Sequence, residues 1–398
     1  MKGFLGTLLG ACLPAFFILT PVHAAPTVTR APAVQAEKIL SQVFEAIEHS
    51  KFDQALERVE ALIAANPNYR LAHMIRGDLL LARTRTLSGF GNAGNVPQEK
   101  IEDLRAEALS RLRALKERPA PGRVPSYVLQ FRQDQSHALV VDSKRSRLYV
   151  YANDRGRPRF VADYYVTLGK RGIEKVREGD KKTPVGVYHV TANLPVRKLG
   201  DFYGSGAFPI NYPNEWDKRH GRNGHGIWLH GTPSDTFARP PRASDGCIVL
   251  SNVDLQLLSS ELQVGLTPVI IADEIQWVDS AAQEEERKSL AQAIEAWRLD
   301  WETLDTDKYL RHYSSKFQSA DQNYEQWAAH KRKVNGGKGW AKIALTAVSM
   351  FRNPGKDDFV VVSFEQGYRS SNLSNSMRKR QYWMKEGARW KIIYEGTA

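Results

Sequence analysis

Two residues in the middle of the chain could together perform nucleophilic chemistry. Cys247 lies in the stretch Ser-Asp-Gly-Cys-Ile-Val (244–249), and His230 ends the stretch His-Gly-Ile-Trp-Leu-His (225–230). A thiol near its reference pKa is mostly protonated at neutral pH, so a catalytic cysteine requires a neighbouring base or positive charge. If residues 226–230 form a strand that ends beside the turn with Cys247, His230 can be that base. The sequence therefore predicts a thiol nucleophile paired with a histidine.

The residue before the thiol predicts a tight turn. Gly246 allows the backbone to turn sharply just before Cys247, because glycine adopts conformations that other residues avoid. Such a turn can direct the N–H groups of both residues toward one point. These donors could hold the oxyanion that forms when a thiolate attacks an amide carbon.

Other interpretations of these side chains stay open at this point. Cys247 could be an inert buried thiol. His220, His225, His230 and Cys247 could be zinc ligands, but their spacings give no compact ligand pair. His225 alone is typical of a hydrogen-bonded structural histidine. We therefore expect no metal and no organic cofactor.

The N-terminus predicts export. An apolar run over 4–20 follows a basic residue, and small residues precede position 25, so residues 1–24 are expected to be a secretory signal peptide. An uncleaved anchor and lipidation of Cys12 are the alternatives. Cleavage would leave Cys247 as the single thiol in a compartment where thiols are normally paired, which favours a reactive role. We expect a periplasmic or otherwise exported protein.

The composition narrows the choice of partners. The 398 residues are 42% hydrophobic and 25% charged, and no apolar run outside the predicted signal is long enough to span a bilayer. The formal net charge of +12 suits an anionic partner. Export removes nucleic acid from the expected partners and leaves the anionic cell envelope, unless the charge serves solubility alone.

Three blocks of different composition follow the signal, and the first two are predicted to be helical and mostly β. Residues 33–117 show apolar residues at helical spacing, and we expect a helical packing or dimerisation module there. A Pro-rich linker separates this module from residues 127–275. In the second block, β-branched and aromatic runs at 138–142 and 147–151 flank a polar turn and predict a hairpin. The middle block is therefore predicted to be mostly β.

The last block, residues 280–398, is predicted to be α+β. It begins with a long helix that carries an apolar stripe, and a meander of strands follows. The stripe consists of Leu290, Ile294, Trp297 and Trp301. This order of elements resembles the nuclear-transport-factor-2-like (NTF2-like) fold, an α+β cone.

The middle block resembles the L,D-transpeptidase catalytic domain, also called the YkuD domain. The signature of that family is His-Gly, a variable stretch, and then Ser-x-Gly-Cys followed by an apolar residue. It matches His230, Gly231 and residues 244–248. The segment Gly-Asp-Lys-Lys-Thr-Pro-Val-Gly-Val-Tyr (179–188) is similar to the family's Thr-Pro-x-Gly-x-Tyr segment. These motifs occur in the family's order.

The resemblance implies a role for each matched residue. Cys247 would be the nucleophile, and His230 would be the general base and acid. The backbone carbonyl of Gly231 would orient the imidazole, while Ser244 and Gly246 would shape the nucleophile turn. The chain departs from many transpeptidases in one respect, because their Cys-x-Arg reads Cys-Ile-Val here. The missing arginine removes a fixed cation and a bidentate donor near the site.

The domain order is similar to that of the cell-shape-determining L,D-carboxypeptidases. That resemblance implies removal of the terminal D-Ala from tetrapeptide stems of peptidoglycan, at the bond to the D-centre of meso-diaminopimelate. One alternative is an L,D-transpeptidase that forms cross-links or attaches and releases envelope lipoprotein. Another is a non-catalytic cell-wall-binding scaffold. The expected partners are peptidoglycan stem peptides, and a homodimer through the helical module and binding of envelope proteins are left open.

Overall fold

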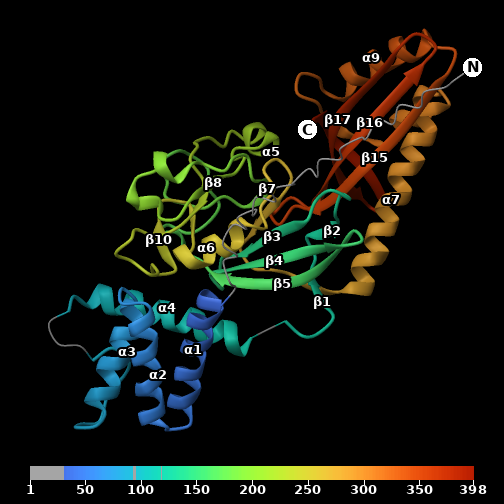
Figure 1. The fold of residues 1–398 in the computed structure, drawn as a ribbon. Helices are drawn as coiled ribbons and strands as arrows, with labels where there is room; N and C mark the ends of the chain where they lie inside the picture. Colours follow the sequence, from blue (N-terminus) through green and yellow to red (C-terminus); the bar gives the residue numbers. More distant parts are fainter. Residues whose placement is uncertain (1–30, 93–95, 118) are drawn as a thin grey trace, which may run out of the picture.

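The computed structural model describes residues 31–92, 96–117 and 119–398, and Figure 1 shows their arrangement. A group of helices, a mostly β domain and an α+β domain follow one another along the chain, which confirms the predicted fold class. The predicted signal peptide at 1–24, with Cys12, lies outside these residues. Within them, no helix is long and apolar enough to cross a membrane.

The helical module contains four helices whose apolar faces form one core. Leu40, Val43, Val59 and Leu62 are almost completely buried in it, because apolar residues recur at helical spacing and must share one face. The four helices are α1 (Ala31–Glu48), α2 (Phe52–Ala65), α3 (Arg70–Leu81) and α4 (Gln98–Lys116). In Figure 1, helix α4 and one end of helix α1 lie on the side of the module that faces the β domain.

The core of the β domain is a five-stranded sheet of order β5-β4-β3-β12-β7. The predicted hairpin is confirmed, since β3 and β4 pair antiparallel and Asp142 lies opposite Arg147 across the turn. The strands are β3 (His137–Asp142), β4 (Arg147–Asp154), β5 (Arg157–Tyr165), β7 (Gly186–His189) and β12 (Pro268–Ala272).

Shorter elements of the same domain surround the reactive residues. A three-stranded sheet has the order β11-β9-β8, and β10 pairs with β6. These elements are β6 (Leu168–Gly169), β8 (Ala207–Pro209), α5 (Glu215–Arg219), β9 (Trp228–His230), β10 (Arg242–Ser244), β11 (Ile248–Val249) and α6 (Asn252–Ser259), with 3₁₀ turns at Val196–Lys198 and Asp201–Tyr203.

In the C-terminal domain, a long helix packs on a curved antiparallel sheet. The predicted stripe of helix α7 (Ser280–Glu302) is buried against that sheet. The other elements are α8 (Thr306–Leu310), β14 (Tyr313–Gln318), α9 (Tyr324–Gly336), β15 (Ala341–Arg352), β16 (Phe359–Ser370), β17 (Ser374–Glu386) and β18 (Arg389–Thr397).

Two short strands from the start of the β domain tie it to the C-terminal domain. Strand β1 (Arg123–Pro125) pairs with β13 (Trp277–Asp279), just before helix α7. Strand β2 (Val128–Gln130) pairs with β15, so the C-terminal sheet has the order β14-β18-β17-β16-β15-β2. Neither strand was predicted, because three residues carry no periodic signal.

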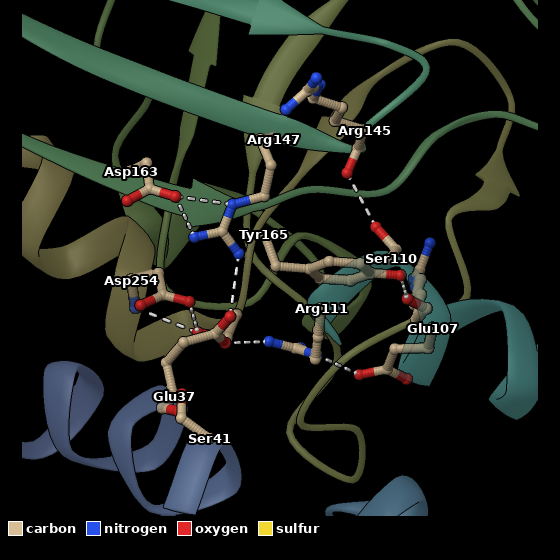
Figure 2. Close-up of polar contacts among 12 residues, drawn as sticks. Glu37, Ser41, Glu107, Ser110, Arg111, Arg145, Arg147, Asp163, Tyr165 and Asp254 are labelled. Carbon is tan, nitrogen blue, oxygen red and sulfur yellow. Dashed lines mark hydrogen bonds and ion pairs between the residues drawn. The ribbon is translucent and has the colours of Figure 1, made fainter. Parts of the chain in front are cut away.

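A cluster of charged side chains joins the helical module to the catalytic domain (Figure 2). Glu37 of helix α1 accepts hydrogen bonds from Arg111 of helix α4 and, at 2.9 Å, from Arg147 of strand β4. Arg147 also donates to Asp163, and Arg111 donates to Glu107 at 2.9 Å. Both arginine side chains are buried. Buried cations require such paired carboxylates, so this cluster depends on the module being docked.

Candidate active site

Two parallel strands bring the reactive residues together. Strand β11 pairs with β9 so that Ile248 lies opposite Leu229 and Val249 opposite His230. Cys247 directly precedes β11. Because side chains alternate along a strand, Cys247 and His230 belong to the same face of this sheet, on neighbouring strands.

The imidazole of His230 is fixed by the next peptide group. Its Nδ1 lies 2.7 Å from the carbonyl oxygen of Gly231. A carbonyl oxygen only accepts, so Nδ1 carries the proton and Nε2 keeps the lone pair of a base. His230 is 1% exposed. Burial lowers its pKa to about 4, against the opposing effect of the Gly231 hydrogen bond. The imidazole is therefore neutral at physiological pH.

The thiol of Cys247 is protonated in this structure's resting arrangement. Its Sγ donates to the carbonyl oxygen of Gly226 at 3.3 Å. Burial raises the pKa of Cys247, although the backbone N–H of Trp228 opposes that effect. Within the described residues, no hydrogen bond joins the thiol to His230. The pair is thus a neutral thiol beside a neutral base, and proton transfer must accompany attack.

Ser244 and Gly246 shape the nucleophile turn. The hydroxyl of Ser244 donates to the carbonyl oxygen of Cys247 at 2.7 Å and accepts from the N–H of Gly246 at 3.1 Å. Gly246 has φ +127°, and a Cβ there would lie 2.6 Å from the carbonyl oxygen of Lys182. The Gly246 N–H is thus used inside the turn. Of the two expected oxyanion donors, only the N–H of Cys247 lacks a partner within the described chain.

Thr183 of the upstream Thr-Pro segment is hydrogen-bonded to the nucleophile turn. Thr183 is fully buried, and its hydroxyl donates to the carbonyl oxygen of Gly246 at 3.0 Å. The same hydroxyl accepts from the N–H of Gly169 at 2.9 Å. This contact explains why the Thr-Pro motif accompanies the cysteine motif, although 63 residues separate the two partners.

Asn252, at the start of helix α6, braces the histidine segment and was not predicted from the sequence. Its side-chain amide donates to the carbonyl oxygen of Thr232 at 2.8 Å, and its Oδ1 accepts from the N–H of Ser205 at 2.8 Å. A Cβ on Gly231 would lie 2.1 Å from that Oδ1. Glycine is therefore required beside the histidine. No motif spacing pointed to Asn252, since its partners are remote in the sequence.

Aromatic rings surround the imidazole. The ring centroids of Phe202 and Tyr203 lie 5.7 and 5.3 Å from that of His230. Trp228 is half-buried and packs on Tyr203, with the ring centroids 4.9 Å apart. Phe202 is 54% exposed. These rings give the reactive pair an apolar wall that opens to solvent at Phe202.

The remaining sequence candidates lie outside this arrangement. His225 is largely exposed and pairs with Glu178 at 3.6 Å. Val249, at the position of the family's arginine, is 2% exposed within strand β11. In the parts of the chain that the structure describes, no group of three or more His, Cys, Asp or Glu side chains could hold a metal ion.

Comparison with protein families identifies two of the three parts. Residues 136–271 match the L,D-transpeptidase catalytic domain (YkuD), and residues 289–396 match the Cds6 C-terminal NTF2-like domain. Both predicted resemblances are confirmed. The chain therefore contains a domain of the L,D-transpeptidase catalytic (YkuD) type, followed by an NTF2-like domain.

Two solved structures are similar to this chain over about two thirds of its length. Bd1075 from Bdellovibrio bacteriovorus is 29% identical, with a TM-score of 0.61, over 69% of this chain and 98% of its own. The helical cell shape determining protein Pgp2 from Campylobacter jejuni is 26% identical, with a TM-score of 0.59, over 68% of this chain and 95% of its own. The comparison with curated protein sequences found no match.

Proposed function

We propose that this protein is a cysteine-dependent L,D-carboxypeptidase that removes the terminal D-Ala from tetrapeptide stems of peptidoglycan. The observation that carries the proposal is the His230 imidazole, held by Gly231 in the tautomer of a base on the sheet face that Cys247 shares. The similarity of the chain to a cell-shape-determining protein agrees with an enzyme that trims stem peptides.

The reaction would proceed through a thioester. Sγ of Cys247 attacks the carbonyl carbon of diaminopimelate while Nε2 of His230 takes the thiol proton. The N–H of Cys247 stabilises the oxyanion. The imidazolium returns the proton to the amide nitrogen, and D-Ala leaves. Water then attacks the thioester, gives its proton to His230, and releases the thiol and the tripeptide stem.

The acyl acceptor decides between carboxypeptidase and transpeptidase. In a transpeptidase, an amine of a second stem would attack the same thioester. Release of a lipoprotein from its stem would be the reverse reaction and would also pass through this thioester. We favour water because buried Val249 replaces the arginine that many transpeptidases carry at this position, so that cation is missing from the site.

The proposal includes location and assembly. We propose that residues 1–24 direct export to the periplasm, and that the domains span 33–117, 127–275 and 280–398. A homodimer through the helical module is the second part of this proposal, and sedimentation of the mature protein decides between one copy and two.

The test uses the chain without residues 1–24, together with its Cys247→Ala variant. Both are incubated with purified muropeptides, and the products are identified by liquid chromatography and mass spectrometry. Cys247-dependent loss of one D-Ala from tetrapeptides supports the proposal. Cross-linked or D-amino-acid-exchanged products would establish a transpeptidase instead. Stem binding without any Cys247-dependent product would establish a cell-wall-binding scaffold.

A further inference from the structure

Arg239 is a cation without a direct ion-pair partner beside the reactive pair. Its guanidinium carbon lies 4.6 Å from the centroid of the Phe202 ring, and that ring lies 5.7 Å from the imidazole of His230. Within the described chain, the guanidinium forms no hydrogen bond or ion pair. The side chain is partly buried, so its charge loses hydration, and the carboxylates of Asp235 and Asp245 act on it only from a distance.

Two other cations of this region form direct ion pairs. Lys170 pairs with Asp245 at 2.9 Å, and Lys175 pairs with Asp180 at 2.8 Å. Arg239 differs because an aromatic face, and no paired carboxylate, contacts its guanidinium. An arginine kept in this state can receive an anion that comes with the substrate.

The charge of Arg239 reaches both reacting groups. Burial has the largest effect on the pKa of Cys247 and of His230, raising the first and lowering the second. The positive charge of Arg239 lowers both values. The guanidinium is thus close enough to act on whatever lies between the thiol and the imidazole.

The backbone of Arg239 is held from two sides. The hydroxyls of Tyr165 and Thr167 each donate to its carbonyl oxygen at 2.9 Å. Two residues earlier, the ring of Phe237 packs on Tyr69 of the helical module, with the centroids 4.3 Å apart. Both the catalytic sheet and the helical module therefore fix the position from which this side chain reaches.

We propose that Arg239 binds the α-carboxylate of the leaving C-terminal residue and thereby restricts cleavage to chain ends. This inference rests on the proposed carboxypeptidase function. In a C-terminal residue, the carboxylate is attached to the same Cα as the scissile amide nitrogen, so it must lie near Sγ during attack. A planar guanidinium can bind it through two hydrogen bonds, which a chain continued by another amide cannot accept in the same way.

The test compares a tetrapeptide stem that ends in a free D-Ala carboxylate with the same stem ending in D-Ala amide. The wild-type protein should prefer the free acid. Arg239→Gln should lower kcat/KM for the acid by about 10- to 100-fold, the loss expected for a charge-assisted hydrogen bond, and should leave the amide almost unchanged. Arg159→Gln, an exposed residue of strand β5 without a side-chain partner in the described chain, is the charge-matched control.

Equal losses on both substrates, or no loss on either, would overturn the assignment. If kcat/KM falls equally on both substrates, the rate at which a neutral reagent alkylates Cys247 shows whether the substitution has lowered the reactivity of the thiol. Calorimetric binding to the Cys247→Ala protein separates this proposal from the proposed function. If the wild-type protein releases no D-Ala, the proposed function is wrong. Arg239 is still supported as the carboxylate site if the Cys247→Ala protein binds the free-acid stem more tightly than the amide stem and the Cys247→Ala/Arg239→Gln protein does not. Equal binding of the two stems by the Cys247→Ala protein rejects the assignment.

Discussion

Glu37 of helix α1 accepts a hydrogen bond from Arg147 of strand β4 at 2.9 Å, across the contact between the helical module and the catalytic domain. Glu37 also accepts from Arg111, so one carboxylate serves two buried guanidinium groups. Removing it would leave two like charges close together. The docking of the module is therefore predicted to depend on this single side chain.

Glu37→Gln should destabilise the folded protein by about 2 kcal/mol, because it leaves buried cations only partly compensated. Chemical unfolding of the wild type and the variant measures the difference. Glu48→Gln is the matched control, since Glu48 pairs with Lys116 on the exposed surface of the same two helices and should change little. Equal effects of the two substitutions would contradict a special role for the cluster.

Asp254 lies beside Glu37 in the same cluster (Figure 2) and should make stability depend on pH. Burial raises its pKa from 3.8 to about 6, and the Glu37 charge adds to that effect. A raised folded-state value means that its stabilising contribution is present below pH 3.8 and is lost as the pH rises through 6. Asp254→Asn should thus be more stable than the wild type above pH 6, by about 3 kcal/mol. Thermal midpoints measured across this range test it, and a constant difference would reject the titration.

The depressed pKa of His230 predicts an unusual acid limb of activity. Because burial lowers it to about 4, the base stays available below its ordinary value of 6.5. The rate constant kcat/KM should therefore fall near pH 4, and an acid limb near 6.5 would indicate an imidazolium paired with a thiolate. The lowered pKa of His230 also makes the stability of the folded protein depend on pH. The neutral imidazole's contribution is complete above pH 6.5 and is lost as the pH falls through 4.

Gly231→Ala should reduce kcat/KM by about 100-fold, the loss typical of displacing a catalytic group by about 1 Å. The added Cβ would lie 2.1 Å from Oδ1 of Asn252, so the backbone that orients His230 must move. Asn252→Ala in the same chain removes the closest of these contacts, leaving backbone atoms of Ser205 and Tyr203 at 3.0 and 3.2 Å, and should restore part of the activity. Steady-state kinetics of the single and double variants decide this. If the double variant is no better than Gly231→Ala, the steric explanation is wrong.

Phe237→Ala should weaken catalysis from outside the reactive pair. The ring of Phe237 packs on Tyr69 of the helical module, and the chain continues directly to Arg239. Loss of that contact frees the segment, so we expect KM for the free-acid stem to rise several-fold, on the order of 1 kcal/mol. Kinetics on the acid and amide stems measure the change. A fall in kcat with KM unchanged would place the effect on the chemical step instead.

The sequence predicted the elements that repeat a pattern over many residues. The stripe of helix α7 buries one face, so its periodicity shows in the sequence, whereas the hairpin of β3 and β4 is buried on both faces and shows as β-branched and aromatic runs around a polar turn. Strand β9 lies within the expected strand 226–230, but other strands of two or three residues, such as β8 and β11, carry too little pattern. The motif resemblance supplied what periodicity could not.

Two important residues could not be predicted because their partners are distant in the sequence. Asn252 contacts Ser205, and Arg239 lies over Phe202. In each case the contact depends on how the loops fold back over strand β9. Gly246 was expected to donate its N–H to the oxyanion. Only the structure shows that this N–H is already bonded to Ser244.

Strand β2 has a consequence for assembly. A sheet edge with unpaired N–H and C=O groups can recruit a strand from another chain, and such edges favour aggregation. Here Val128–Gln130 occupies the β15 edge of the C-terminal sheet. The chain thereby covers the end of that edge, at Met350 and Phe351, with a strand drawn from the start of its own catalytic domain. Removing residues before 131 would free a template for strand addition, so the linker region also protects this protein against self-association through β15.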